Sequence, residues 1–460
     1  MSRAVQWRWT IAATALACAM SIGLFCPRYV LWRGLDLPPA LHHPEINRAH
    51  FALQQIEDPF APIASESNRA MRWRLFFPIL AHYTGLKPTV FFALPFIGCL
   101  LALSLITHVV LRETASAALA LLSTVLAATT SWFFVATGWL AYFDGWYILG
   151  LVAVCAVRGR GVLVASCLIV AWIDERFVVA LPLALALRAA LLDWRCREAV
   201  LALALVAPYI LFRAVMIITA QDENSATHVE DHLAVFSLGN DALLSGLWHG
   251  LRAGWLLVAA CMALLFRYGI RYALVAGLAA GVALLVNSVL AWDYSRNVSV
   301  LLPCMLVGIL LLARWRLNRA LAALALALAV NLLAPAKHVN AAFSLDIENV
   351  WRERMRENQL PDTVNPVAYN MRAIGLADAG DSSGAETYFT YALALAESYP
   401  GADAYFVPDV YWNRATLYLR TERWKDARAD LVAALACAPA DWQQRHLAEE
   451  YAAGIAGRNP

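Results

Sequence analysis

The chain has 460 residues, of which 61% are hydrophobic, and its mean hydropathy is +0.57. Soluble globular domains are about 45–50% apolar, so this composition excludes an ordinary soluble protein and indicates an integral membrane protein. The formal net charge of +2 is too small to indicate a nucleic-acid partner. The nine cysteines form no CxxC pair and show no metal-ligand spacing, so neither a disulfide framework nor a zinc site is predicted.

Apolar runs of about 20 residues, the length that crosses a bilayer, follow one another to about residue 336. The first run resembles a signal peptide, but no small-residue cleavage site precedes Pro27, and we interpret it as an uncleaved span. The short runs 161–174 and 177–193 are also compatible with two halves of one broken unit. We predict about eleven spans, near residues 9–26, 88–110, 115–136, 139–157, 161–174, 177–193, 198–219, 244–266, 272–291, 296–313 and 320–336.

Arginines mark alternate connections between these spans, and the positive-inside rule assigns those connections to the cytoplasm. The arginines concerned are Arg112, Arg158, Arg160, Arg195, Arg197, Arg267, Arg271, Arg314, Arg316 and Arg319. The opposite connections carry the acidic residues, and they also include residues 221–240. We therefore predict a multi-pass protein of the inner (cytoplasmic) membrane, whose N-terminus is cytoplasmic and whose C-terminal part lies on the outer side.

The connection from residue 27 to residue 87 is long and lies on the predicted outer side. It carries the acids Glu45 and Asp58, followed by a run of arginines and aromatic residues from Arg72 to Leu80. Such a mixture is typical of helices that lie in the plane of the membrane interface. The alternative is a solvated linker, which would leave the large apolar side chains of this run exposed to water.

Charged residues interrupt several apolar runs at their outer ends. An ionisable residue at the centre of a span costs about 2.5–3.5 kcal/mol on insertion scales, so such residues indicate function or pairing. The tripeptide Asp174-Glu175-Arg176 separates two runs, and a guanidinium paired with a carboxylate can also clamp a phosphate. The alternative is a solvated turn between two spans. Because all the interrupted ends lie on one predicted side, we expect their charged groups to meet.

Two further acidic sites lie at outer ends. Asp293 and Arg296 are three residues apart on one helical face, where they can serve a ligand or simply neutralise each other. Asp144 lies among aromatic residues, and an interfacial aromatic belt explains its neighbours but not its carboxylate.

Histidines provide weaker signals. His228 and His232 are four residues apart with two carboxylates between them, a spacing that on a helix can hold a divalent metal. No third ligand is identifiable, so a metal is compatible with the sequence but not supported, and no cofactor is identified. His108 lies within an apolar run, and we interpret it as a hydrogen-bonded interhelical residue rather than a ligand.

The composition changes after Pro335, and half of the 34 acidic residues lie in the last 120 positions. We predict a linker or amphipathic helix over 337–365 and a soluble helical domain over 366–460. Small and large residues recur in two copies, Ala373, Leu376, Ala385, Phe389 and Ala392, then Ala415, Tyr418, Ala427, Leu431, Ala434 and Pro439. This pattern resembles the tetratricopeptide repeat, although the copies lie 42 residues apart rather than about 34. Unrelated helical hairpins are the alternative.

The predicted fold class is therefore all-α, with a polytopic transmembrane bundle over 1–336 followed by a repeat domain. Over residues 1–335 this plan resembles the GT-C class of membrane glycosyltransferases. The stretches that carry the resemblance are Pro44–Ala52, Arg74–Leu80, Phe143–Trp146, Asp174–Arg176 and Asp293–Arg296.

The resemblance implies transfer of a sugar from a polyprenyl phosphate on the outer face of the membrane. It implies a general base in the first outer loop, for which Glu45 is the first candidate and Asp58 the second. Arg176 and Arg296 are then expected to face the lipid phosphate. Among the acids, Asp174 or Asp144 is expected to orient an arginine or the sugar, and Asp293 and Glu175 complete the expected site.

Two other functions remain open. A membrane-anchored scaffold would recruit a protein partner through the repeats and would tolerate replacement of the loop carboxylates. A transporter would need polar residues that reach both membrane faces, and the cytoplasmic ends offer little beyond the orienting arginines. The partners expected are membrane lipid, a lipid-linked sugar and a protein bound by the repeats.

Overall fold

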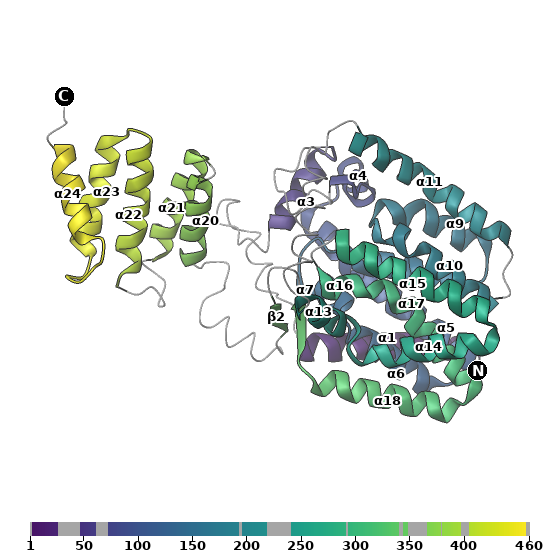
Figure 1. Ribbon diagram of the computed structural model, residues 1–460. Helices are drawn as coiled ribbons and strands as arrows, with labels where there is room; N and C mark the ends of the chain where they lie inside the picture. The colour runs from purple at the N-terminus through teal and green to yellow at the C-terminus, as the bar shows by residue number, and fades with distance from the viewer. Residues whose placement is uncertain are drawn as a thin grey trace. The chain divides into compact units, whose positions relative to one another are not determined.

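The computed structural model describes residues 2–25, 47–60, 72–192, 196–218, 241–290, 293–339, 344–347, 366–378, 380–396 and 404–456. These residues are almost entirely helical, which confirms the predicted helical character of the chain. They belong to two compact units, one containing the described residues of 2–25 and 48–347 and the other those from 366 onwards (Figure 1).

The first unit is a bundle whose helices coincide in position with the apolar runs. Its continuous long helices are α1 (Arg3–Leu24), α5 (Pro88–Thr114), α10 (Arg176–Leu192), α11 (Cys196–Ile218), α15 (Ile270–Leu290) and α18 (Leu317–Leu333). Shorter helices are α6 (Ala117–Ala128), α7 (Ser131–Gly138), α8 (Asp144–Ala156) and α9 (Arg160–Ile169), the last extended by a 3₁₀ turn (Val170–Trp172). Two composite helices contain 3₁₀ turns, α13 (Asp241–Leu251) with α14 (Trp255–Tyr268), and α16 (Tyr294–Asn297) with α17 (Leu302–Trp315).

Among the residues that the structure describes, five helical segments are long and apolar enough to cross a membrane, namely Pro88–Thr114, Arg197–Met216, Ala242–Tyr268, Ile270–Ser288 and Tyr294–Trp315. The pair α6 and α7, bent by 58°, makes a sixth if it counts as one span. The bundle buries 83% of the apolar window in Tyr294–Trp315, but only 17% of that in Arg197–Met216 and 28% of that in Ile270–Ser288. The last two helices therefore expose leucines and valines on a surface that a bilayer would cover.

Glycines allow α8 to pack closely against α5. A Cβ atom on Gly145 would lie 2.6 Å from the carbonyl carbon of Gly98, so no larger residue fits there without backbone movement. The indole nitrogen of Trp146 donates to the carbonyl of Leu94 at 2.8 Å. Close contact through small residues is the usual way that helices associate in membranes, and here it fixes the first turn of α8, which carries Asp144.

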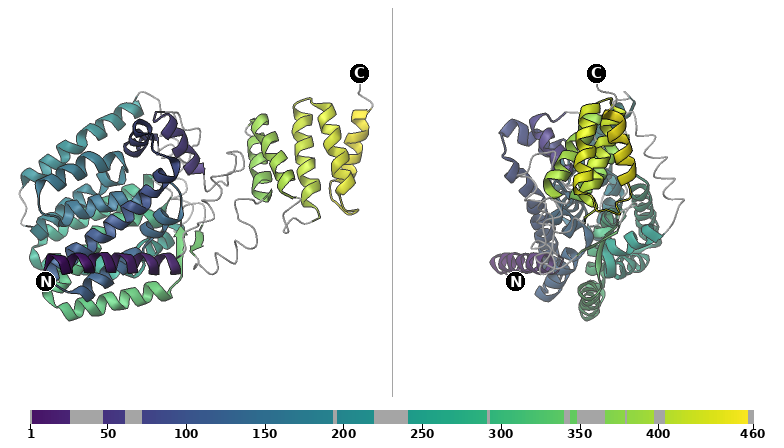
Figure 2. Two further views of the ribbon diagram at one scale, coloured as in Figure 1. Left: turned by 180° about the vertical axis from the view of Figure 1, so that it is seen from behind. Right: turned by 90° about the vertical axis from the view of Figure 1, so that its left-hand side faces the viewer.

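The chain ends and loops of this unit gather at two opposite ends. The N-terminus lies at one end, and the short helices α3 (Asn47–Glu57) and α4 (Phe76–Thr84) lie at the other, together with α7 and α13 (Figures 1 and 2). Helices α3 and α4 belong to the loop that was predicted to hold interfacial helices. The ring of Phe77 in α4 stacks on Phe143 with the centroids 4.8 Å apart, which attaches this loop to the start of α8.

Polar side chains from distant segments form hydrogen bonds with the polar groups at the bend between α6 and α7. The Ser21 hydroxyl donates to the carbonyl of Ala128 at 2.5 Å, and the Asn331 amide donates to the Thr129 hydroxyl at 3.0 Å. Arg252 is fully buried and donates to the carbonyls of Thr129, at 3.4 Å, and Ala334. It therefore places a positive charge beside the C-terminal ends of α6 and α18, where the helix dipole favours a cation.

Part of the segment predicted as a linker or amphipathic helix forms two β-strands, so an amphipathic helix is wrong there. Strand β1 (Ala336–Val339) pairs antiparallel with β2 (Ser344–Ile347), with Ala336 opposite Ile347. The backbone N–H of Val339 donates to the Ser295 hydroxyl at 3.0 Å, and Ala336, His338 and Val339 are buried. Contact with the bundle thus stabilises an extended segment that is too short to show a strand pattern. Residues 348–365 lie outside the described part of the chain.

The second unit is a series of antiparallel helices, α20 (Pro366–Asp378), α21 (Ser382–Ala396), α22 (Phe406–Arg420), α23 (Trp424–Cys437) and α24 (Arg445–Ala456). The recurring alanines are fully buried where the helices meet, at positions Ala373, Ala385, Ala392, Ala415, Ala427 and Ala434. Small residues at these points allow the helices to approach closely. The structure thus explains the spacing of the pattern, while membership of the tetratricopeptide family stays a prediction.

Candidate functional site

Eight charged side chains meet at the end of the bundle that holds α3 and α4. They come from five separate stretches of the chain, and four are arginines and four are acids. We call this set the charge cluster, and its members are Arg48, Arg74, Asp144, Asp174, Glu175, Arg176, Asp293 and Arg296.

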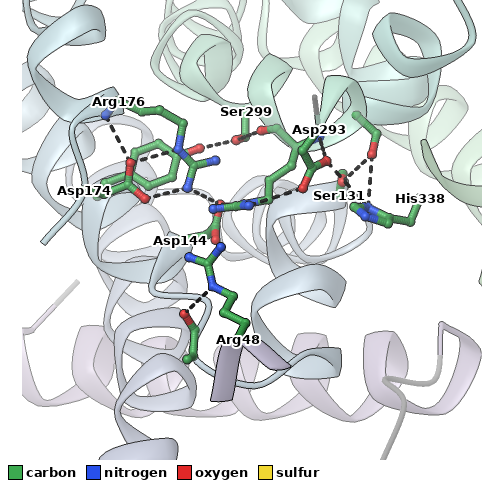
Figure 3. A network of polar contacts seen from close by, with 12 residues as sticks. Arg48, Ser131, Asp144, Asp174, Arg176, Asp293, Ser299 and His338 are labelled. Atoms are coloured by element: carbon green, nitrogen blue, oxygen red, sulfur yellow. Dashed lines mark hydrogen bonds and ion pairs between the residues drawn. The ribbon is translucent and has the colours of Figure 1, made fainter. Parts of the chain in front are cut away.

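Asp144 links the two halves of the charge cluster. It is the first residue of α8 and is fully buried, and its carboxylate gains from the positive end of the helix dipole. Its Oδ1 atom lies 2.9 Å from Nη2 of Arg176 and accepts a hydrogen bond from Nε of Arg296 at 2.7 Å (Figure 3). No hydrogen-bond partner for its Oδ2 atom exists among the described residues.

The tripeptide 174–176 forms the first half at the break before α10. The guanidinium of Arg176 binds Asp174 in a bidentate manner, at 2.8 and 2.6 Å, and lies 4.4 Å from the ring centroid of Tyr147. Arg74 binds Glu175 in the same way, at 2.9 and 2.5 Å, and lies 3.3 Å from Asp174. Burial opposes the charge of Arg74, but Asp174 and Glu175 outweigh it and raise the pKa of Arg74. These residues are not a solvated turn, because Asp174 and Arg176 are buried.

Asp293 and Arg296 form the second half. Their side chains pair at 3.2 Å, as predicted for two residues on one helical face, and Asp293 also accepts from the backbone N–H of Arg296 at 3.3 Å. The pair with Asp293 is not the whole role of the Arg296 guanidinium, because its Nε also donates a hydrogen bond to Asp144. His338 of β1 lies beside this pair, with Nδ1 3.7 Å from Oδ1 of Asp293 and 3.4 Å from the Ser295 hydroxyl. Sequence reasoning missed His338 because it assigned the residue to a linker.

Arg48 from α3 completes the set (Figure 3). Its Nε donates to the carbonyl of Ala141 at 3.0 Å, and its guanidinium carbon lies 3.9 Å from the ring centroid of Tyr142. Arg296 lies 4.5 Å from the same ring, so the electron-rich face of one tyrosine serves two cations. Burial lowers the pKa of Arg48 to about 10. Sequence reasoning assigned no role to Arg48 or Arg74, and their only signal was their place in the arginine- and aromatic-rich outer loop.

The charge cluster is balanced but not saturated. Four guanidinium groups face four carboxylates, so the formal charges cancel. Within the described part of the chain, three buried donors have no hydrogen-bond partner, Nη2 of Arg48, Nη1 of Arg74 and Nη1 of Arg176, and Oδ2 of Asp144 is an unpartnered acceptor. Of these donors, Nη1 of Arg74 lies 3.3 Å from Asp174. A buried polar group left unpaired costs about 1–3 kcal/mol. These open N–H groups and the open carboxylate oxygen are chemically complementary to an oxyanion that also carries a hydroxyl group.

The other candidates lie elsewhere. Asp58 is exposed, and its Oδ1 accepts from the backbone N–H of Phe60 at 3.0 Å in a local turn. Glu45, His228 and His232 lie outside the described residues. His108 was predicted to be hydrogen-bonded, but its Nδ1 has no partner in the described structure, and its ring instead stacks on Trp7 at 5.7 Å.

The described residues contain no group of three metal-binding side chains that could hold an ion. The chemistry that the charge cluster offers is therefore that of guanidinium donors and carboxylate acceptors in a buried setting. Comparisons of the chain with protein-family models, curated proteins and solved structures find no match.

Proposed function

We propose that the protein is a GT-C-type membrane glycosyltransferase that transfers a sugar from a polyprenyl-phosphate donor on the outer face of the membrane. One observation carries this proposal, the convergence of buried arginines with open N–H groups at one end of a membrane bundle. The proposal includes about eleven crossings, a cytoplasmic N-terminus and an outer C-terminal unit. In that arrangement the charge cluster faces the outer leaflet.

The chemistry of sugar transfer needs such a group of donors. As the bond between the anomeric carbon and the phosphate oxygen breaks, negative charge grows on the leaving polyprenyl phosphate. Arg48 and Arg176 would donate their open N–H groups to the phosphate oxygens, and Arg296 would add positive charge nearby. Prearranged donors in a buried site stabilise developing charge strongly, because they need no reorganisation. Asp144 would accept a hydroxyl of the sugar through its open Oδ2 atom.

The acceptor hydroxyl also needs a base. In the proposal Glu45 takes the proton, the acceptor oxygen attacks the anomeric carbon, and polyprenyl phosphate leaves. Glu45 precedes Arg48 by three positions in the sequence. Asp58 remains the second candidate, because the structure places it in an exposed turn with one oxygen already bonded.

Arg48→Gln is the sharpest test. The only hydrogen bond of Arg48 that the structure records goes to a backbone carbonyl, so its removal strands no directly bonded carboxylate. In lipid nanodiscs, mass spectrometry would follow transfer from a polyprenyl-phosphate-linked hexose. Loss of one donor to a developing oxyanion costs about 10²–10³ in rate, and we expect a loss of that size at a temperature well below the melting temperature of the variant.

Arg188→Gln is the matched control. Arg188 is also buried, pairs with Glu198 at 3.0 Å and donates to the carbonyls of Val154 and Val157 at the opposite end of the bundle. If Arg48→Gln and Arg188→Gln transfer sugar equally well, Arg48 does not serve the reaction and the proposed site is wrong.

A membrane-anchored scaffold is the second candidate, and the internal charge balance of the charge cluster favours it. Such a balanced set can serve as structure alone, with the second unit binding a protein partner along its stacked helices. One experiment distinguishes the enzyme from the scaffold, in which variants are tested for their ability to support growth of cells that depend on the protein. Glu45→Gln and Arg48→Gln together abolish the function of an enzyme but leave that of a scaffold, whereas removal of residues 366–460 abolishes that of a scaffold.

A further inference from the structure

Three arginines surround one tryptophan at the end of the bundle opposite to the charge cluster. Trp315 is the last residue of α17, and its side chain is 44% exposed. The guanidinium carbons of Arg319, Arg267 and Arg316 lie 4.7, 5.0 and 5.9 Å from the centroid of its ring. Arg267 comes from the last turn of α14, and the other two come from the start of α18, so three elements build this arrangement.

No carboxylate within the described ranges pairs with any of these three arginines. The acid in the neighbouring connection, Glu113, already pairs with Arg112 at 2.8 Å and with Arg314 at 2.9 Å. The contrast with the charge cluster is clear, because there the formal charges cancel. Here three like charges lie against one ring, and the indole face offsets their repulsion only in part. An anion placed among them would complete the arrangement.

The position indicates which anion is available. Three segments long enough to cross a membrane meet here, because Ala242–Tyr268 and Tyr294–Trp315 end at this point and Ile270–Ser288 begins there. The exposed side chains of Tyr268, the last residue of α14, and Tyr272, in the first turn of α15, lie at the same span ends. Tryptophan and tyrosine at span ends lie at the depth of the lipid headgroups. The positive-inside rule accounts for arginines in these loops, but not for three of them around a single indole.

We propose that Trp315 with Arg267, Arg316 and Arg319, the Trp315 site, binds the phosphate headgroup of an anionic phospholipid such as phosphatidylglycerol. Planar guanidinium groups bind phosphate oxygens in a bidentate manner and stack on an aromatic ring at the same time. The indole ring would pack against the glycerol and the upper acyl chain. A zwitterionic phospholipid fits less well, because its own ammonium group cancels the attraction. This inference does not depend on the proposed enzymatic function.

The test uses the full chain in nanodiscs that contain equal amounts of phosphatidylglycerol and phosphatidylcholine. After extraction into mild detergent, native mass spectrometry would count the phospholipids retained by each protein. The variant Arg267→Gln/Arg316→Gln/Arg319→Gln removes the three charges of the Trp315 site. We expect it to lower the affinity for phosphatidylglycerol on the order of a hundredfold, given the contribution of each basic residue near an anionic surface.

The matched control is Arg158→Gln/Arg160→Gln/Arg197→Gln, which removes three exposed arginines from the same end, none of which contacts an aromatic ring in the described structure. We expect it to retain phosphatidylglycerol like the original protein. Trp315→Ala should weaken retention and Trp315→Phe should restore most of it, because a ring again fills the centre.

Two results would overturn the proposal. Equal loss in the Trp315-site variant and in the control would show that overall charge alone attracts the lipid. Equal retention of phosphatidylglycerol and phosphatidylcholine by the original protein would show that no anionic headgroup is selected. All substituted arginines are exposed, so an unchanged melting temperature should accompany each variant and exclude unfolding as the cause.

Discussion

Asp144→Asn removes one negative charge from the centre of the charge cluster while it keeps the shape of the side chain. The carboxylate is fully buried and pairs with both Arg176 and Arg296, so the substitution leaves one uncompensated positive charge inside the bundle. Removal of one partner from a buried ion pair costs about 3–5 kcal/mol. We expect the lower end, about 3 kcal/mol, because Arg176 keeps Asp174 and Arg296 keeps Asp293.

The free energy of unfolding can be measured by titration with sodium dodecyl sulfate in mixed micelles, followed by tryptophan fluorescence. Glu113→Gln is the control, since Glu113 also pairs with two arginines but these are one-third exposed, and it should cost below about 1 kcal/mol. In the double variant Asp144→Asn/Arg296→Gln the charges balance again, so its loss should be at least about 1 kcal/mol smaller than the sum of the single losses. If Asp144→Asn and Glu113→Gln cost the same, the charge cluster does not contribute as buried ion pairs.

Two further predictions concern packing and pH. Gly145→Ala should cost about 1–3 kcal/mol because its Cβ would overlap the backbone of α5 at Cys99, whereas Gly277→Ala, with open space around it, should be neutral or stabilising in the same titration. In the second unit, the hydrogen bond from Arg423 lowers the pKa of Glu386 in the folded state. The Glu386 carboxylate therefore stabilises the folded state at pH values above its unfolded pKa of about 4.3. This stabilisation is lost as the pH falls through the lower pKa of the folded state. Glu386→Gln should therefore lower the unfolding midpoint of the second unit more at pH 7 than at pH 3, and an equal difference at both values would contradict the assignment.

The positions of the helices could be predicted from sequence because the bilayer imposes one rule. A backbone that crosses hydrocarbon must satisfy its own polar groups, so the apolar runs are helical near the expected residues, although the run 115–136 forms two helices. The strands Ala336–Val339 and Ser344–Ile347 were not predicted, for the opposite reason. These strands of four residues depend on the bundle, through contacts such as that of Val339 with Ser295, and no local sequence pattern indicates them.

The charge cluster was predictable only in part. Asp144, Asp174 and Arg296 stood out because a charge in an apolar run is costly, and the alternation of loops placed them on one side. Arg48 lies in a polar stretch, where an arginine is unremarkable by itself. Its burial results from the contact of α3 with the residues before α8, including Tyr142. A contact between residues 94 positions apart cannot be predicted from the spacing of residues along the sequence.

The bend between α6 and α7 has a consequence for biosynthesis. Its polar groups depend on residues that the ribosome makes much later, because Arg252 and Asn331 follow Thr129 by more than a hundred positions. Until those residues arrive, the broken segment must remain beside water or a helper protein rather than lipid. We therefore expect this segment to reach its final place last, after α18 has emerged. Chains that stop before Asn331 should be recognised and degraded as unfinished.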